Sequence, residues 1–422
     1  MIRSLRTGVT GLRSNQLRLD VIGNNIAGVN TAGFKRSRVL FQDALTQRIA
    51  TGGRLNGPSP TSVSDVGNGV SVGAVDQVWE QGPLEYTNVA TDLAIAGDGF
   101  LVAQSNQGPV LTRNGATQFD ADGYLVTAGG LRVQGWTANA DGSVTTGPLS
   151  DVRIDPSATS PPAPTGGVDV AGNLSAERPV GDEVTMSTVI YDGTGQAHTL
   201  VLTLSKTAAA APESAPGAGD ATNATWEVAS AEVEGATITV PPTTFEFDAN
   251  GELVSSPLAV DLAGTFGNGS PLGGPVGAVT VGLDLTQYGG STTASVKSQD
   301  GAAAGDLVDF GFDQSGMLVL SFSNGRRQPV AQLALGMVSN PDGLSQVGDG
   351  FYATTAASGD LRLGRAGSEV PSGVISGALE GSNVDLAQEF TDMIVAQRGY
   401  QANARVITTS DELLQETVQL KR

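Results

Sequence analysis

Carboxylates are the only reactive side chains that this sequence supplies in number. The chain of 422 residues has 43 Asp and Glu residues, no Cys and a single histidine, His198. Without cysteine there can be no disulfide, no thiolate nucleophile and no cysteine-ligated zinc. One histidine excludes a multi-histidine metal site and leaves a histidine-based catalytic triad with one candidate. The chemistry that remains is that of carboxylates, as calcium ligands or as a glycosidase pair.

A pattern that occurs three times tests the calcium alternative. Its copies are Phe119-Asp120-Ala121-Asp122-Gly123, Phe247-Asp248-Ala249-Asn250-Gly251 and Phe312-Asp313-Gln314-Ser315-Gly316. An EF-hand loop opens in a similar way, but no copy is followed by the bidentate Glu of a twelve-residue loop or by a helix. Asp and Asn favour the start of a turn, and Gly adopts positive φ at its end. We therefore interpret each copy as a β-hairpin, and we predict no metal site and no cofactor.

A catalytic role is not predicted either. His198 stands in Gly195-Gln196-Ala197-His198-Thr199-Leu200, at the entry of an expected strand, with no catalytic motif around it. We interpret it as a solvated turn histidine. Aromatic residues make up 5 % of the chain and provide few platforms for sugar stacking. We expect no enzyme; the alternative class is a secreted glycan-binding or glycan-cleaving β protein, which glycan hydrolysis by an isolated 155–290 fragment would support.

Charge is distributed unevenly along the chain. Residues 1–48 have a net charge of +6, residues 49–379 of −23 and residues 380–422 of −3. We interpret the acidic middle as a solvated surface. Nucleic acid is not an expected partner, because phosphate contacts need a basic face. No apolar run is long enough to span a membrane, and arginines interrupt the N-terminal segment, so neither a membrane partner nor a cleaved secretory signal is expected.

Two amphipathic helices are predicted at the ends of the sequence. In each, one narrow stripe recurs at spacings of three and four residues, the period of a coiled coil. The N-terminal stripe consists of Leu5, Val9, Leu12, Gln16, Leu19, Ile22 and Ile26. The C-terminal stripe consists of Phe390, Met393, Gln397, Tyr400, Ala404, Ile407, Asp411, Leu414 and Val418. This second helix is expected over residues 383–420, with Ser382-x-x-Asp385 as its capping box.

A stripe of this length cannot be buried by one helix alone. One alternative is that both helices pack on the body of their own chain. We favour the other, in which the helices pack on each other and on copies from other chains. The apolar members of the two stripes are then the predicted assembly interface: Leu5, Val9, Leu12, Leu19, Ile22, Ile26, Phe390, Met393, Tyr400, Ile407, Leu414 and Val418. Aspartate at Leu12 or Ile407 is expected to abolish polymerisation and to leave the β body folded.

Between the helices the sequence is typical of a mainly β, multidomain protein. Alternating runs such as Thr199–Leu204 are separated by Gly, Asn and Asp. The sequence Gly97-Asp98-Gly99-Phe100 recurs as Gly348-Asp349-Gly350-Phe351, which predicts one split β domain with a second β domain inserted. The expected domains are a helical inner core (1–30 with 380–422, packed together), a connector (31–72 with 366–379), a split inner β domain (73–154 with 291–365) and an inserted outer β domain (155–290). Flexible hinges are expected at Thr51–Gly73 and Ser368–Gly377, and shortening Gly52–Pro60 is expected to stiffen the assembly.

Four motifs resemble one known family. Residues 24–35 read NNIAGVNTAGFK, close to NNIANVNTxGFK, and residues 92–100 read DLAIAGDGF, close to DLAIxGDGFF. Thr112-Arg113-Asn114-Gly115 continues the second motif, and Leu379-Glu380-Gly381-Ser382-Asn383 leads into QRGYQANAR at 397–405. The chain departs from the family pattern only at Gly28, Leu101 and Ala404. Together the motifs resemble the flagellar axial family of bacteria, which contains rod, hook and hook–filament junction proteins. The motif residues of interest are Asn24, Asn25, Asn30, Gly33, Phe34, Gly97, Asp98, Gly99 and Phe100.

The resemblance implies a structural role. Within the family, the insertion of about 135 residues is typical of the hook class, whereas distal rod subunits, the alternative, share both ends but are shorter. A hook subunit would assemble with copies of itself into a flexible tube that transmits motor torque as a universal joint. The implied partners are rod proteins below, a hook cap during assembly and junction proteins above. The implied location is the extracellular hook, reached unfolded through the flagellar type III export apparatus.

Overall fold

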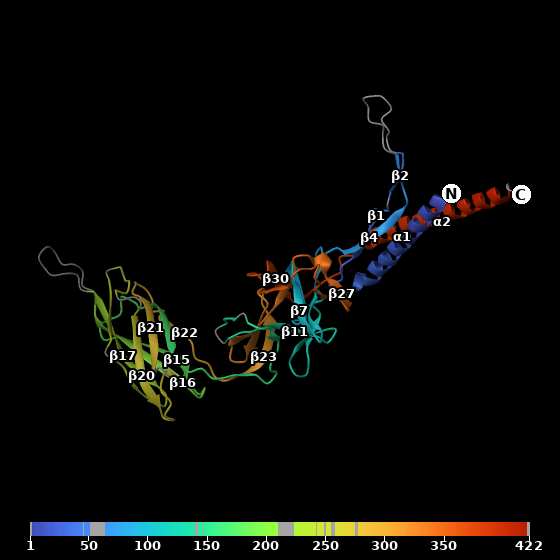
Figure 1. The fold of residues 1–422 in the computed structure, drawn as a ribbon. Coiled ribbons are helices and arrows are strands. Elements are labelled where there is room, and N and C mark those ends of the chain that lie inside the picture. Colours follow the sequence, from blue (N-terminus) through green and yellow to red (C-terminus); the bar gives the residue numbers. More distant parts are fainter. Residues whose placement is uncertain are drawn as a thin grey trace. The chain divides into compact units, whose positions relative to one another are not determined.

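The computed structural model describes residues 2–44, 46–50, 64–139, 142–145, 147–209, 223–241, 243–248, 250–254, 258–274 and 277–419. The chain divides into two compact units (Figure 1). Unit 1 comprises Met1–Asp155, Phe310–Leu320 and Gln328–Arg422, and unit 2 comprises Pro156–Asp309 and Ser321–Arg327. The predicted class, a mainly β multidomain chain with a helix at each end, is confirmed.

The two helices lie in unit 1 and pack along each other. Helix α1 spans Ile2–Ala27 and helix α2 spans Leu386–Gln419. The predicted capping box is wrong, because the Asp385 carboxylate itself caps α2 by accepting from the amides of Ala387 and Gln388, at 2.9 and 3.2 Å. Neither helix is long and apolar enough, over its described residues, to cross a membrane.

A β-hairpin lies along α1. Its strands are β1 (Ser37–Asp43) and β4 (Val70–Gln77), which pair antiparallel, and beyond them β2 (Thr46–Ala50) pairs with β3 (Ser64–Gly67). The hairpin falls mostly within the predicted connector 31–72. The greater share of the expected hinge at Thr51–Gly73, including all of Gly52–Pro60, lies outside the described residues.

The rest of unit 1 is built around one large, branched sheet. The central path runs β24 (Met317–Phe322), β25 (Arg327–Leu333), β11 (Arg132–Thr137), β7 (Phe100–Ser105), β8 (Gly108–Thr112), β28 (Phe351–Ala353) and β27 (Ser345–Gly348). Branching strands are β9 (Thr117–Phe119), β10 (Leu125–Thr127), β12 (Ser150–Asp151), β26 (Leu335–Met337) and β29 (Arg362–Gly364). The two Gly-Asp-Gly-Phe copies therefore enter strands of one sheet, β7 and β28, on either side of β8.

The expected C-terminal hinge is paired strand in the structure. Strand β30 (Ser372–Ser376) pairs with β6 (Leu93–Gly97), and β31 (Ala378–Glu380) pairs with β5 (Leu84–Tyr86). The segment 366–379 thus differs from the flexible connector that we expected, because its backbone hydrogen bonds are used within unit 1. The outer limits of the four predicted domains stay a prediction.

Unit 2 contains two sheets around one core. The five-stranded sheet has the order β18 (Ala236–Thr239), β20 (Leu258–Phe266), β21 (Ala278–Thr286), β14 (Gly167–Asn173) and β22 (Ser295–Gln299). The four-stranded sheet has the order β15 (Glu183–Tyr191), β16 (Ala197–Ala208), β17 (Ala224–Val233) and β19 (Thr244–Phe247). Short β13 (Thr159–Ser160) pairs with β23 (Gly305–Phe312). Unit 2 continues past residue 290 because β22 pairs with β14.

The three predicted hairpin turns are confirmed. In each, the Asp carboxylate accepts two backbone amides, as Asp120 does from Asp122 and Tyr124 at 3.0 and 2.7 Å. The closing glycine has positive φ, which is +81° at Gly123. Asp192 forms a fourth turn of this kind that we had not predicted, although an aromatic residue before Asp and a Gly three after it repeat the pattern.

The interpretation of His198 as a solvated turn residue is wrong. The side chain is only 10 % exposed, because the ring stacks on Phe266 with centroids 4.2 Å apart. Its Nδ1 lies 2.9 Å from the Glu234 carbonyl oxygen, and its Nε2 lies 3.6 Å from the buried Asp192 carboxylate. The histidine contributes to the packing of unit 2. No group of three metal-ligating side chains occurs within the described stretches of the chain.

Candidate functional site: the helix pair and the motif junction

The helices meet through a row of small and polar residues, here called the contact row. On α1 it consists of Ser4, Gly8, Gly11, Asn15, Arg18, Ile22 and Asn25, and on α2 it includes Glu389, Asp392, Gly399, Asn403, Ile407 and Ser410. Ser4 Oγ lies 3.4 Å from Ser410 Oγ at one end, and Asn25 Nδ2 donates to Glu389 Oε1 at 3.2 Å at the other. These two contacts make the pair antiparallel.

Glycine allows the close approach of the two helices. A Cβ atom placed on Gly11 would lie 2.8 Å from the Asn403 side chain, and one on Gly399 would lie 2.8 Å from that of Asn15. Both distances are shorter than a Cβ tolerates, so larger side chains would force the helices apart. An ion pair of 2.8 Å between Arg18 and Asp392 adds a polar contact to the row.

Most of the predicted apolar stripe lies one residue away from the contact row, and Ile22 and Ile407 belong to both. On α1, Leu5, Leu12 and Ile26 each follow a contact residue, and on α2 the stripe likewise lies mostly beside the row. In an antiparallel pair, positions that follow the contact row on both helices lie on the same side. Most of the large apolar side chains therefore line one flank of the helix pair, while Ile22, Ile407 and mainly small or polar residues fill its centre.

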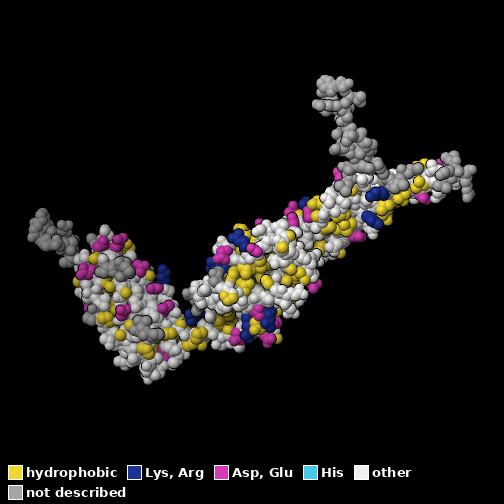
Figure 2. All heavy atoms as spheres, in the orientation of Figure 1, with side chains coloured by type: hydrophobic (Ala, Val, Ile, Leu, Met, Phe, Trp, Pro, Cys, Tyr) yellow, Lys and Arg dark blue, Asp and Glu magenta, His cyan; other side chains and the backbone are white. Residues whose placement is uncertain are grey.

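Most of the predicted interface residues keep solvent-exposed surface. Phe390 and Tyr400 are exposed, at 51 % and 36 %, and only Ile22 is fully buried. Half-buried members are Leu5, Val9, Leu12, Leu19, Ile26, Met393, Ile407 and Leu414. The side chain of Val418 lies outside the described residues. Figure 2 shows hydrophobic side chains at the surface along this helical end of the molecule.

The family motifs meet at a buried ionic cluster, here called the motif junction (Lys35, Arg113 and Glu380). Lys35 Nζ lies 2.6 Å from Glu380 Oε1, and Arg113 Nη1 lies 3.3 Å from Glu380 Oε2. Lys35 and Glu380 side chains are 1 % exposed and that of Arg113 is 5 % exposed. The junction thus joins the segment after α1, the β6–β9 region and the segment before α2.

Backbone groups complete the motif junction. Lys35 Nζ also donates to the Glu80 carbonyl at 2.7 Å, and the Gly82 amide donates to Glu380 Oε1 at 2.9 Å. Burial lowers the pKa of the Lys35 ammonium, and the hydrogen bond and charge of Glu380 oppose this shift. Burial also lowers the pKa of Arg113. One carboxylate therefore compensates two buried cations.

The predicted motif glycines supply close backbone approaches at this junction. Gly33 has φ of +69°, and a Cβ there would lie 2.5 Å from the Arg113 carbonyl carbon. The Gly33 amide donates to the Glu380 carbonyl at 2.7 Å, and the Gly97 carbonyl accepts from Arg113 Nη2 at 2.9 Å. At both positions the backbone itself therefore packs against the motif junction.

The other motif residues divide between core and surface. Phe100 is buried, and its ring lies 5.3 Å from that of Trp79, edge to face. Asn25 and Gly99 are also buried, Phe34 is half-buried, and Asn24, Asn30 and Asp98 are exposed. Asn24, Asn30 and Asp98 belong to the motifs but form none of the hydrogen bonds described above for the motif junction.

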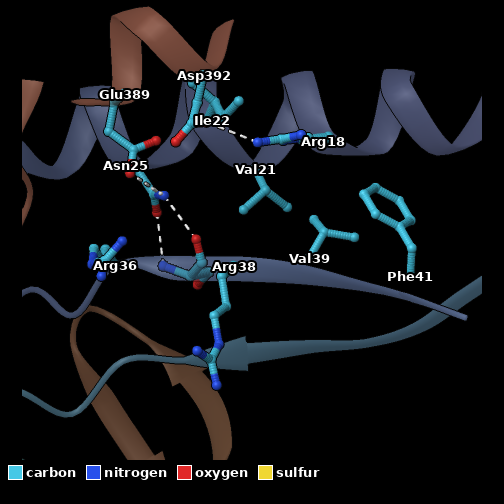
Figure 3. A pocket seen from close by; sticks show the side chains of 11 residues that line it. Arg18, Val21, Ile22, Asn25, Arg36, Arg38, Val39, Phe41, Glu389 and Asp392 are labelled. Carbon is cyan, nitrogen blue, oxygen red and sulfur yellow. Dashed lines mark hydrogen bonds and ion pairs between the residues drawn. The ribbon is translucent and has the colours of Figure 1, made fainter. Parts of the chain in front are cut away.

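Asn25 connects both helices with the hairpin (Figure 3). Its side chain donates to the Ser37 carbonyl and accepts from the Ser37 amide, both at 2.8 Å, and it also contacts Glu389. Burial raises the pKa of Glu389, and the hydrogen bond from Asn25 opposes this shift. The Asn25 side chain thus links α1, α2 and β1 at one point along the helix axes.

The motifs contain Lys35, Arg113 and Glu380, but sequence reasoning did not select them as site residues. The signal was present, because each is a charged residue inside a motif whose other members are mostly apolar, small or amide residues. Asn383 was missed in the same way. Its side chain accepts from the Arg36 amide and donates to the Val78 carbonyl, at 2.8 and 2.7 Å.

Comparison with known proteins bears on all these segments. Family models match along the chain: "Flagella basal body rod protein" at 5–35, "Flagellar hook protein FlgE/F/G D1 domain" at 94–170, "Flagellar basal body protein FlaE D2 domain" at 175–302 and "Flagellar basal body rod FlgEFG protein C-terminal" at 375–420. The chain is 35 % identical to the flagellar hook protein FlgE of Borreliella burgdorferi, with all of both chains covered. It is 30 % identical to that of Escherichia coli, with 98 % of each covered.

A solved structure shares the fold. The Helicobacter pylori flagellar hook protein FlgE2 matches with a TM-score of 0.53 over 70 % of this chain and 100 % of that chain, at 17 % identity.

Proposed function

The chain belongs to the flagellar hook protein family and is a structural component of the bacterial flagellar hook, and from that membership we propose how it works. Copies polymerise through their terminal helices into a tube. The tube bends while it rotates and so transmits motor torque as a universal joint. The partners proposed with this role are the rod, the hook cap and the junction proteins, with export through the flagellar type III apparatus.

One observation carries the proposal of polymerisation. The helices contact each other through small residues and leave their large apolar side chains beside the contact row, with Phe390 51 % exposed. Burying one such side chain contributes about 2 kcal/mol. Several positions of this kind on one flank, among them Leu12, Phe390 and Tyr400, support a strong contact with further copies. The apolar flank is therefore proposed as the assembly interface of the inner core.

The motif junction supports the transmission of torque. A helical core that carries load must not turn independently of the β region of its own subunit. Both segments that join the helices to the β region of unit 1 are held at Glu380, by the Lys35 ion pair and by the Gly33 amide. We propose that the junction couples the helix pair rigidly to that β region, while bending occurs between subunits.

Polymerisation of three variants tests the proposal. Leu12→Asp and Phe390→Asp are expected to abolish sedimentable tubes, because each places a charge in the apolar flank. The matched control is Val308→Asp on β23, where the parent side chain is 68 % exposed and outside the helices; it is expected to polymerise as the parent does. Tubes seen by electron microscopy for Leu12→Asp and Phe390→Asp at the parent concentration would refute the interface. Curved tubes support the hook role, and uniformly straight tubes contradict the bending role.

A further inference from the structure

A groove between α1 and β1 remains open among the described residues. It encloses about 210 Å³, and Figure 3 shows Val21 of α1 opposite Val39 and Phe41 of β1 along it. Phe41 is 41 % exposed. Arg18 and Asp392, which also line the groove, form an ion pair of 2.8 Å. The lining is mostly polar, and Val21, Val39 and Phe41 form one apolar stretch of it that a side chain from outside can contact.

Basic side chains outnumber acidic ones around this groove. Its lining includes Arg18, Arg36 and Arg38 against Glu389 and Asp392, and Arg6 and Arg13 lie further along α1. Of these, Arg18 and Arg38 form ion pairs, at 2.8 Å with Asp392 and at 3.9 Å with Asp76. The other three arginines form none with any described residue. An occupant that combines an apolar side chain with carboxylates would complement both properties of the groove.

The end of α2 has that composition. Ser410 faces Ser4, and α2 continues from there to Gln419, for about two more turns. Leu413 is 53 % exposed there, and Glu412 and Glu416 are exposed on either side of it in sequence. Neither glutamate forms an ion pair with a described residue.

The end of α2 cannot reach the groove of its own chain. Asp392, which lines the groove, and Leu413 lie on one continuous helix and are 21 residues apart, or roughly 32 Å along its axis. A rigid helix cannot fold its end back over that distance. A groove that holds the end of α2 therefore belongs to a different copy.

We propose that the end of α2 of one copy docks in the α1–β1 groove of the next. Leu413 enters beside Val21 and Phe41, and Glu412 and Glu416 face the arginines. The proposal rests on the proposed polymerisation and adds a contact that is distinct from the apolar flank. Groove and helix end are different surfaces of one chain, so the contact is heterologous, the kind of contact from which an open helical assembly is built.

An engineered cysteine pair tests the contact directly, because the chain has no cysteine of its own. Phe41→Cys and Leu413→Cys in one chain are expected to give a ladder of covalent multimers when sedimented polymer is oxidised. The control pair is Leu413→Cys with Val89→Cys, where Val89 is 51 % exposed elsewhere in unit 1; it is expected to give less than a tenth of the cross-linked product. Polymer without a ladder would overturn the docking and leave the proposed function standing. A parent chain that forms no polymer would instead overturn the proposed function.

A charge exchange provides an independent readout. Variant A carries Arg13→Glu and Arg36→Glu, and variant B carries Glu412→Arg and Glu416→Arg. At about 0.1 M salt, where close charges still interact, each alone is expected to raise the critical concentration at least tenfold. In an equimolar mixture of A and B, the critical concentration is expected to return to within threefold of the parent value, since each groove then meets a helix end of opposite charge.

Recovery in the mixture also shows that both variants are folded. The control, Arg326→Glu with Arg327→Glu at an exposed turn of unit 2, is expected to polymerise as the parent does, alone and in mixtures. Unchanged polymerisation of A and B alone, or a mixture no better than its components, would overturn the proposal.

Discussion

Replacement of Glu380 by Gln should destabilise unit 1 strongly. The carboxylate is 1 % exposed and accepts from Lys35 Nζ, Arg113 Nη1 and the Gly82 amide at 2.6, 3.3 and 2.9 Å. Glutamine keeps one acceptor oxygen, but its NH2 group points at a group that is itself a hydrogen-bond donor. Lys35 and Arg113 also lose the carboxylate with which both form an ion pair. Breaking a buried ion pair in this way costs about 3–5 kcal/mol of unfolding free energy.

Two further variants serve as comparisons for the loss of unfolding free energy expected of Glu380→Gln. Lys35→Met removes one cation and leaves Glu380 paired with Arg113, so we expect a smaller loss of about 1–3 kcal/mol, mainly because Glu380 Oε1 loses a donor; the Glu80 carbonyl still accepts from Asn383 Nδ2 at 3.0 Å. Glu369→Gln makes the same chemical change in an exposed pair with Arg365, whose side chains are 43 % and 34 % exposed. We expect that change to cost much less than Glu380→Gln, because the pair is exposed to solvent.

Urea unfolding followed by tryptophan fluorescence measures these losses. Trp79 and Trp136 belong to unit 1 and Trp226 belongs to unit 2, so a Trp226→Phe background restricts the signal to unit 1. Trp79 is the residue before Glu80, and it therefore lies in the segment that Lys35 contacts. The reasoning is refuted if Glu380→Gln loses less than about 1 kcal/mol, or if it loses less than Lys35→Met.

Three other changes have defined outcomes. Gly33→Ala should cost about 2–3 kcal/mol in the same assay, because positive φ and a backbone contact at 2.5 Å both oppose a Cβ; Gly130→Ala, with φ of +75° and open space around it, should cost about 1 kcal/mol. Gly11→Leu should reduce the helical circular dichroism of the monomer and expose both helices to protease, which an unchanged digestion pattern would contradict. For Asp192, burial favours the neutral form, but hydrogen bonds to the charged carboxylate outweigh it and hold the pKa at about 2, below its ordinary 3.8. The stability of unit 2, read from Trp226, should therefore be full above pH 3.8 and fall as the pH drops through about 2, and Asp192→Asn should remove that dependence.

Sequence patterns predicted the existence of both helices, the mainly β class and the hairpin turns. These features depend on local rules: apolar spacing, and Asp or Gly at turn positions. The contact row between the helices was not predicted, because apolar periodicity selects the largest side chains. The closest contacts of this helix pair are made by residues such as Gly8, Gly11 and Asn15. Most of the predicted stripe therefore lies one residue away from the contact row.

The motif junction could not be derived from local rules either. Charged residues are normally exposed, so nothing in the neighbourhood of Lys35 predicts an almost fully buried ammonium. Its partner Glu380 lies 345 residues away in the sequence, and only the closed fold brings the two together. The same holds for His198, whose stacking partner Phe266 lies on a strand that the local sequence does not specify.

The separation of Lys35 and Glu380 also sets the order in which the subunit can fold. Unit 2 uses a contiguous stretch for most of its core, so its strands can pair as soon as that stretch is free. The motif junction needs residues from both ends, and closing so long a loop is slow compared with forming local contacts. In a chain that emerges from one end, unit 2 would therefore be folded while Lys35 and Arg113 are not yet paired with Glu380. The arrival of Glu380 completes unit 1 and places α2 beside α1, so the same late event that finishes the monomer also creates its surface for the next copy.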